Sequence, residues 1–173
     1  MPLPARESGF TGADPVYRLT VASPVGALTL FEQSGAITHL LWAASNRLRN
    51  GRPTPLLAAA RIQLEDYFAG RLKRFHLPLA PAGTEFQYRV WAALREIPAG
   101  KTLTYGELAR RLDSGPRAVG TACGANPIPI IVPCHRVLAA GGRLNGYSGQ
   151  GGIVTKKRLL ELEGALEGRR SSG

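Results

Sequence analysis

The chain has 173 residues, and its 22 Lys and Arg against 12 Asp and Glu give a formal net charge of +10 at pH 7. This length can bury a core as one domain or two small ones, and 44% hydrophobic residues is ordinary for a globular protein. No apolar run is long enough for a transmembrane helix, and the two cysteines are too few for a disulfide framework. The excess of positive charge favours a polyanionic partner, most often nucleic acid or an anionic membrane, although a basic protein without such a partner has the same composition.

The chain begins with MPLPARESGFTGADPVYR, which is polar, rich in Gly and Pro, and lacks the apolar core of a signal peptide. We therefore expect a flexible arm over residues 1–15 and a cytoplasmic protein with reduced thiols. Residues 16–43 hold three short apolar stretches separated by SPVG and EQSG, turn signals that predict an antiparallel meander. PLLAAARIQLEDYFAG then has helical periodicity that ends near Gly70, with apolar positions at Leu57, Ala60, Ile62 and Leu64. No candidate site stands out in this first half, which we interpret as structural.

The second half predicts a helix-turn-helix. TEFQYRVWAALREIPAG is amphipathic, with Thr84 as a candidate cap and one apolar face made by Phe86, Val90, Trp91 and Leu94. The next helix, TLTYGELARRLDSG, begins with a capping box formed by Thr104 and Glu107. Its DSG ending is followed by Pro116, whose fixed φ suits the first turn of a further helix, RAVGTACGAN. Two helices joined by a short turn in a basic protein are typical of DNA-binding proteins.

The RAVGTACGAN helix carries little side-chain bulk, because its residues include Ala118, Gly120, Thr121, Ala122, Gly124 and Ala125. Such a helix either packs tightly in a core or approaches a nucleic-acid backbone closely. Arg117 is the one long polar side chain on it. A cation in the first turn opposes the helix dipole, so we expect Arg117 to extend outward.

Cys134 lies in the stretch NPIPIIVPCHRV, at the end of an apolar run. The β-branched residues of this run predict a buried strand that ends at the cysteine. Cysteine is more often a small core residue than a nucleophile, and its thiol needs a base to react at neutral pH. His135 is adjacent, but neighbouring strand side chains point in opposite directions. Either the chain bends here or a water links the two side chains.

The last helix, TKKRLLELEG, offers a partner for this histidine. At 100° per residue from Leu159, Glu163 lies at about 40° on the leucine face, and a carboxylate there requires a partner. His135 is the candidate. We interpret Lys156, Lys157 and Arg158 as a solvated helix face.

Other uses of the cysteines fit the spacing less well. Cys123, Cys134 and His135 form no CxxC and lack a fourth ligand, so no metal site is predicted. A thiol protease would place its cysteine at a helix start rather than after a strand. Cys123, in the middle of a helix, is interpreted as structural.

Taken together, RAVGTACGANPIPIIVPCHRV, GYSG and KKRLLELEG resemble the O6-alkylguanine-DNA alkyltransferases, the methylated-DNA–protein-cysteine methyltransferases. The resemblance runs throughout residues 84–164 and is weak before them. It implies an α/β (α+β) fold, with a small ribonuclease-H-like domain at 16–80 that contains an antiparallel sheet. A mostly helical, winged-helix-like domain with the helix-turn-helix would occupy 84–166, and 167–173 would be a disordered tail.

The resemblance also implies a mechanism without cofactor or metal. Cys134 would take the alkyl group from guanine O6 irreversibly, once per protein molecule. His135 would remove the thiol proton through a water, and Glu163 would orient the imidazole. Asn126 would brace the turn before the cysteine, and Tyr105 would donate a proton to guanine N3.

The same resemblance assigns the pocket and the DNA contacts. The backbone amide of Ser148 would donate near O6, the carbonyls of Cys134 and Val137 would accept from the exocyclic amine, and the pocket would also include Tyr147, Gly149 and Pro129. The bare helix would enter the minor groove, with Arg117 filling the space of the flipped nucleotide and close approach at Ala118, Thr121, Ala122 and Gly124. The implied partner is double-stranded DNA containing O6-alkylguanine, not a membrane. The protein would be a monomer that assembles cooperatively on DNA.

Two other functions remain as alternatives. A non-catalytic alkyltransferase-like protein would bind the lesion without transfer, but those relatives lack the acceptor cysteine. A helix-turn-helix transcription regulator would leave Glu163 and the PCHRV sequence unexplained.

Overall fold

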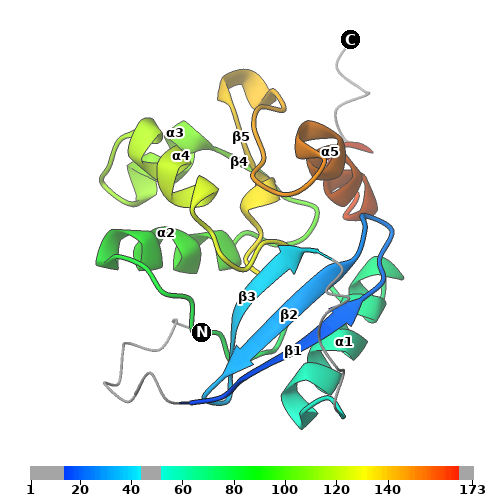
Figure 1. Ribbon diagram of the computed structural model, residues 1–173. Helices are drawn as coiled ribbons and strands as arrows, with labels where there is room; N and C mark the ends of the chain where they lie inside the picture. Colours follow the sequence, from blue (N-terminus) through cyan, green and yellow to red (C-terminus); the bar gives the residue numbers. More distant parts are fainter. Residues whose placement is uncertain (1–13, 44–51, 168–173) are drawn as a thin grey trace. The chain divides into compact units, whose positions relative to one another are not determined.

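The computed structural model describes residues 14–43 and 52–167 (Figure 1). The predicted arm at 1–15 and the predicted tail at 167–173 lie almost entirely outside these ranges. The chain divides into two compact units, one ending at Ala82 and the other beginning at Gly83.

The first unit contains the expected antiparallel meander. Strands β1 (Val16–Val21), β2 (Leu28–Gln33) and β3 (Ala36–Trp42) pair in the order β1-β2-β3. The turn between β2 and β3 has positive φ at both Ser34 (51°) and Gly35 (76°), as a type I′ hairpin requires. Each strand contributes a buried leucine to one cross-strand row, made of Leu19, Leu30 and Leu40.

Helix α1 (Pro55–Phe68) covers the meander and completes this core. Thr54 caps it by accepting from the Leu57 amide at 3.1 Å, and Gly70 follows its end with φ 75°. The helix buries Leu57, Ala60, Leu64 and Tyr67. Ile62 was expected among the apolar positions, but it is 53% exposed and lies off this face.

The second unit begins with α2 (Glu85–Arg95). Its capping box forms between Thr84 and Gln87, and the buried face contains Val90, Trp91 and Leu94 as predicted. The Trp91 indole donates to the carbonyl of Ala122 at 2.9 Å, which fixes α2 against the later helix that carries Ala122.

The predicted helix-turn-helix is confirmed. Helix α3 (Tyr105–Arg111) begins with the capping box of Thr104 and Glu107, and α4 (Pro116–Gly124) begins at a proline after a short turn. Asp113 in that turn has φ 51°, a conformation that Asp tolerates better than most residues.

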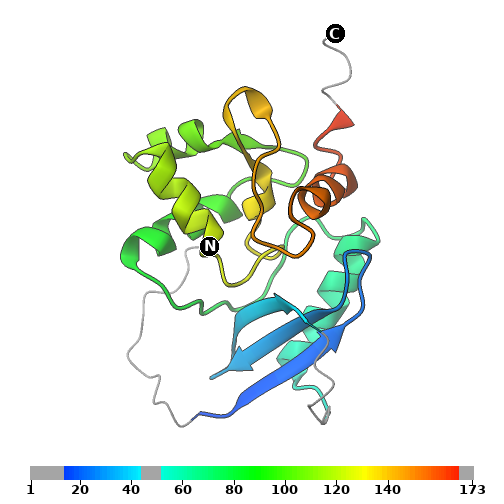
Figure 2. The same cartoon turned by 45° about the horizontal axis from the view of Figure 1, so that its top comes forward.

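The remaining elements surround the PCHRV sequence. A one-turn 3-10 helix, η1 (Cys134–Arg136), leads into β5 (Val137–Leu138), which pairs in parallel with β4 (Leu103–Thr104). A second short turn, η2 (Ala140–Gly142), and a loop then lead to α5 (Gly152–Leu162). Figures 1 and 2 both show this connecting segment lying between α4 and α5. Within the described residues, no helix is long and apolar enough to cross a membrane.

Candidate functional site

The predicted strand before Cys134 is absent, and a compact loop takes its place. The Asn126 side chain closes this loop at both ends: its amide donates to the Val132 carbonyl at 2.8 Å and its oxygen accepts from the Ile128 amide at 3.0 Å. Ile130 is fully buried with φ 72°, a strained conformation for a β-branched residue. The strand prediction was wrong because three prolines in this stretch remove amide donors that a ladder needs.

Cys134 begins η1 and is buried. Its amide donates to the Val132 carbonyl at 2.9 Å, and its carbonyl accepts from the Val137 amide. The cysteine therefore stands at the start of a short helix, which removes the strand-based argument used against a thiol-protease interpretation. Since the chain bends here, Cys134 and His135 lie on one turn rather than on opposite faces of a strand.

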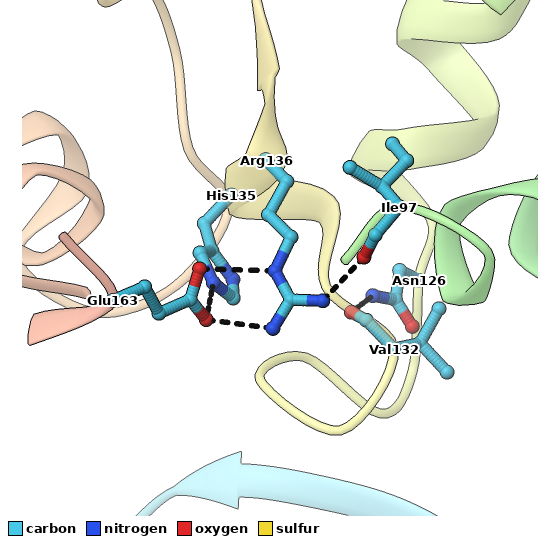
Figure 3. Close-up of polar contacts among 6 residues, drawn as sticks. All are labelled: Ile97, Asn126, Val132, His135, Arg136 and Glu163. Carbon is cyan, nitrogen blue, oxygen red and sulfur yellow. Dashed lines mark hydrogen bonds and ion pairs between the residues drawn. The ribbon is translucent and has the colours of Figure 1, made fainter. Parts of the chain in front are cut away.

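The two residues that follow Cys134 form a buried cluster with Glu163 at the end of α5 (Figure 3). His135 Nε2 lies 2.7 Å from Glu163 Oε1, so the predicted contact between these residues is present. Arg136 donates to the same carboxylate, from Nε to Oε2 at 2.9 Å and from Nη2 to Oε1 at 2.8 Å. Its Nη1 donates to the Ile97 carbonyl at 2.6 Å. Sequence reasoning missed Arg136, whose partners lie far away in the chain.

Burial and charge set the protonation of this cluster. Burial by itself would raise the pKa of Glu163, but hydrogen bonds and charges from His135 and Arg136 lower it to about 2. Burial lowers the pKa of His135, with the Arg136 and Lys156 charges acting in the same direction and Glu163 opposing them. At neutral pH the cluster therefore holds an ionised carboxylate beside a neutral imidazole.

The tautomer of His135 follows from its partner. An ionised carboxylate only accepts hydrogen bonds, so Nε2 must carry the imidazole proton. Nδ1 is then an acceptor, and it is buried without a hydrogen-bond partner among the residues that the structure describes. A buried acceptor of this kind is available to a water or to a thiol proton.

A cavity of about 180 Å³ lies beside Cys134. This is many times the roughly 10–15 Å³ that a cavity needs in order to hold one water. Five of the predicted site residues line it, namely Tyr105, Gly124, Cys134, Tyr147 and Ser148, and so do Gly120, Cys123 and Gly146. Cys123 was interpreted as structural, and its place in the cavity lining was missed.

The two thiols and the phenol at this cavity are neutral in the resting protein. Burial raises the pKa of Cys134, although a hydrogen bond with Asn126 and the charge of Lys156 oppose the rise. Burial also raises the pKa of Cys123 and of Tyr105, each to about 12.

Lys156 was predicted on a solvated helix face, and this prediction was wrong. Its relative exposure is 0%, and Nζ donates to the carbonyls of Asn145 at 3.2 Å and Gly146 at 3.1 Å. The same nitrogen lies 5.8 Å from the centre of the Tyr105 ring. The helix arithmetic contained the signal, since Lys156 lies at about 60° from Leu159, next to Glu163.

The residues predicted to meet DNA divide into two groups. Arg117, Ala118, Thr121 and Gly124 are exposed on α4. Ala122 is 2% exposed and its carbonyl binds Trp91, so it faces α2. The predicted DNA contact at Ala122 is therefore corrected to a packing contact.

Three further predicted pocket residues lie outside the cavity lining. Val137 is buried in β5, and Pro129 is buried in the Asn126 loop, where it bridges to Val132. Gly149 lies in the loop before α5 and is half-buried. Among the described residues, no group of three His, Cys, Asp or Glu side chains is arranged to hold a metal ion.

Both units match known protein families. Residues 16–81 match the family described as 6-O-methylguanine DNA methyltransferase, ribonuclease-like domain, and residues 85–165 match 6-O-methylguanine DNA methyltransferase, DNA binding domain. The structure, with its antiparallel sheet followed by a helical unit, and these matches together confirm the predicted α/β (α+β) fold.

Individual relatives agree with the family matches. A methylated-DNA–protein-cysteine methyltransferase of Methanosarcina mazei is 57% identical over 155 residues, which are 86% of this chain and 97% of that protein. The crystal structure of Mycobacterium tuberculosis O6-methylguanine methyltransferase is similar with a TM-score of 0.75 at 45% identity, covering 87% of this chain and 94% of that one. The structure of Mycobacterium tuberculosis OGT in complex with DNA gives 0.74 at 48% identity, over 84% and 91%.

Proposed function

This chain belongs to the O6-methylguanine DNA methyltransferase family, and from that premise we propose that it repairs DNA by moving an alkyl group from guanine O6 to Cys134. The observation that carries the proposal is a buried cysteine at a cavity, backed by the His135–Glu163–Arg136 cluster. In this reaction the S–C bond forms as the C–O bond breaks, and the electron pair of that bond goes to guanine. A thioether does not revert, so each molecule reacts once.

His135 is proposed as the base that takes the thiol proton through a water. Its unpartnered Nδ1 supports this role, because the proton on Nε2 is already donated to Glu163. Glu163 holds the imidazole in this tautomer and stabilises the imidazolium that forms. A depressed imidazole pKa and a raised thiol pKa keep both groups neutral until the substrate is bound.

Tyr105 is proposed as the donor to guanine N3. Its phenol has a pKa raised to about 12 by burial and by the nearby thiols, so it is protonated in the resting state. Donation neutralises the departing guanine, and the phenol recovers a proton from the imidazolium through solvent. The atoms then balance: the proton lost by the thiol is the one that guanine gains.

The remaining predicted residues shape the site. Tyr147 and Ser148 line the cavity, which supports a role for the Ser148 amide near O6 and for Tyr147, with Gly149, beside the alkyl group. The carbonyls of Cys134 and Val137 are proposed acceptors for the exocyclic amine. Asn126 braces the loop before the cysteine, a role supported by its two hydrogen bonds, and Pro129 belongs to that loop.

We propose double-stranded DNA containing O6-alkylguanine as the partner, bound through α4. Exposed small residues on this helix permit close approach, and Arg117 would fill the place of the flipped nucleotide. Residues 84–166 would form the DNA-binding and transfer domain, and 16–80 the structural domain. The proposed catalytic groups all come from one unit, which supports a reactive monomer. Cooperative assembly on DNA is proposed from the family resemblance alone. Two free cysteines agree with a cytoplasmic location.

The test is intact-mass spectrometry with peptide mapping after mixing the protein with a short duplex carrying O6-methylguanine. We expect one methyl group on Cys134, saturating at one per molecule. Cys123→Ala is the matched control, because it removes the other thiol of the same cavity and should still accept methyl. Cys134→Ala should bind the duplex without transfer.

Other outcomes would replace the proposal with a specific alternative. Tight binding to the lesion without any mass change would identify a non-catalytic lesion-binding protein. Protection of one DNA sequence in a footprint, without preference for the lesion, would identify a regulator. Methyl transfer by Cys134→Ala would show that the acceptor is wrong.

A further inference from the structure

Lys156 is a fully buried cation that the proposed reaction does not use. It lies on α5, one turn before Leu159, and its relative exposure is 0%. Placing an ammonium group in a protein interior is costly unless hydrogen bonds or an opposite charge compensate it. Its surroundings therefore indicate why it is there.

The ammonium group binds the loop that covers the cavity. Nζ donates to the carbonyls of Asn145 and Gly146 at 3.2 and 3.1 Å, immediately before Tyr147 and Ser148 in the chain. Because Gly146, Tyr147 and Ser148 all line the cavity, these two bonds fix one side of it.

The same ammonium group also contacts Tyr105, another residue that lines the cavity. Nζ lies 5.8 Å from the centre of the Tyr105 ring, within the range of a cation–π interaction. Lys156 thus contacts both the loop and α3, the two elements that carry the tyrosines of the cavity.

What Lys156 lacks is an anion. Within residues 14–43 and 52–167, no carboxylate lies within ion-pair distance of Nζ, whereas Lys157, the next residue, pairs with Glu161 at 3.8 Å. The anion expected to form in this region is the thiolate of Cys134. A buried cation without a carboxylate partner favours that anion, because each charge compensates the other.

We propose that Lys156 is a positioning residue for alkyl transfer, one that joins the 145–148 loop to Tyr105 and supplies the positive charge that the Cys134 thiolate faces. This inference rests on the function proposed above. It adds a role for a residue that neither touches the substrate nor belongs to the proton path through His135.

The charge has a defined sign of effect on the thiol. Several other ionisable groups surround Cys134. They lie on α3, α4, η1, α5 and the loop before α5, and are Tyr105, Cys123, His135, Arg136, Tyr147, Lys156 and Glu163. Among these, the Lys156 charge opposes the rise that burial causes in the pKa of Cys134. It also lowers the pKa of His135. Removing the charge should therefore raise both pKa values.

The experiment compares Lys156→Met, Lys156→Gln and Lys156→Arg with the control Lys157→Met. Methionine fills similar space without charge or hydrogen bonds, glutamine keeps amide donors without charge, and arginine keeps the charge. Two readouts are needed: the single-turnover rate of methyl transfer from duplex DNA between about pH 6 and pH 10, and the pH dependence of Cys134 alkylation by iodoacetamide in free protein.

We expect Lys156→Met and Lys156→Gln to raise the apparent pKa of Cys134 by about one unit or more, which lowers the thiolate fraction about tenfold. Methyl transfer should slow by about tenfold at pH 7.5, with its pH profile displaced to higher pH and DNA affinity changed by less than about threefold. Lys156→Arg should recover most of the rate, and Lys157→Met should match the wild type.

A merely structural lysine would behave differently. Removing a buried ammonium group that has no opposite charge relieves a desolvation cost, so we expect the melting temperature of Lys156→Met not to fall along with its transfer rate. The loss of a merely structural lysine would lower both. The proposal is overturned if the uncharged variants keep the wild-type thiol pKa, or if they slow transfer equally at all pH values. If Lys156→Met does not fold, Lys156→Gln and Lys156→Arg decide the question.

The two proposals fail in distinguishable ways. A wild-type protein that transfers no methyl group contradicts the proposed function, whatever the lysine does. A wild type that transfers normally, together with uncharged variants that match it, contradicts only the role of Lys156. The iodoacetamide readout needs no DNA, so it measures the thiol in either case.

Discussion

Arg136 binds both oxygens of the Glu163 carboxylate, at 2.9 and 2.8 Å, in a geometry that leaves Oε1 shared with His135. Because the guanidinium is always charged, it keeps this carboxylate ionised whether or not the imidazole carries a second proton. In the proposed reaction, Glu163 would therefore orient His135 and stabilise its charged form without itself receiving the proton. The charge of the buried Arg136 also lowers the pKa of His135, whereas Glu163 raises it. The two partners therefore have opposite effects on the basicity of the imidazole.

The Glu163→Gln variant should be strongly destabilised. It leaves the buried Arg136 charge without its anion, and breaking a buried pair in this way costs about 3–5 kcal/mol. Urea unfolding followed by circular dichroism measures the change. Glu161→Gln is the matched control on the same helix. Within the part of the chain that the structure describes, its exposed carboxylate pairs only with Lys157, so a change within about 0.5 kcal/mol is expected. If both variants lowered the free energy of unfolding equally, a specific role of the His135–Glu163–Arg136 cluster in stability would be contradicted.

The stability conferred by Glu163 should depend on pH below about 4.5. Its pKa falls from 4.5 in the unfolded chain to about 2 in the folded protein, so the folded state prefers the ionised form. This stabilisation, on the order of 3 kcal/mol, is fully present above 4.5 and is lost as pH falls towards 2. The difference in unfolding free energy between wild type and Glu163→Gln should shrink across that window. A difference that stays constant from neutral pH to the acid limit would show that the folded carboxyl titrates normally.

Asn126→Ala should impair both stability and transfer. The variant leaves the buried Ile128 amide without its side-chain acceptor, at a cost of about 1–3 kcal/mol, while the Val132 carbonyl keeps its bond from the Cys134 amide. The loop would then hold Cys134 less firmly, so methyl transfer should slow more than DNA binding weakens. Asn145→Ala is the control, because its side chain is exposed and only its backbone carbonyl binds Lys156. Denaturant unfolding and single-turnover kinetics test both parts.

Arg117→Ala should affect duplex DNA more than single-stranded DNA. If Arg117 fills the place of a flipped nucleotide, its loss should slow transfer from duplex DNA, where a stacked base must leave the double helix. Transfer from single-stranded DNA should slow less, because its bases are less firmly stacked. We expect the ratio of the duplex rate to the single-strand rate to fall by about tenfold, which corresponds to roughly 1.4 kcal/mol. Arg61→Ala, an exposed arginine of α1, serves as a control for net charge. An equal loss on both substrates would assign Arg117 to phosphate binding alone.

Local signals in the sequence predicted the elements well. The cap at Thr84, the capping box at Thr104 and the Pro116 start of α4 depend on residues a few positions apart, and each formed. The contact between His135 and Glu163 also followed from a local rule, since a carboxylate on a leucine face needs a partner.

The predictions that were wrong came from sequence signals that favour opposite structures. A β-branched run favours a strand, but the interleaved prolines and the two-sided bonding of Asn126 favour a closed loop. Lys156 has the helix angle of a buried residue, yet a cluster of cations suggests a surface. Arg136 had no local signal, because its partners Ile97 and Glu163 are 39 and 27 residues away.

The burial of Cys134 has a consequence for the protein before it meets its substrate. Oxidants such as peroxide react with exposed thiolates, and this sulfur is buried with a pKa raised by that burial. The proposed acceptor is thus a poor target for cellular oxidants, even though it would accept an alkyl group only once. A protein molecule synthesised before the DNA is alkylated therefore keeps a reduced, reactive thiol until it binds its substrate.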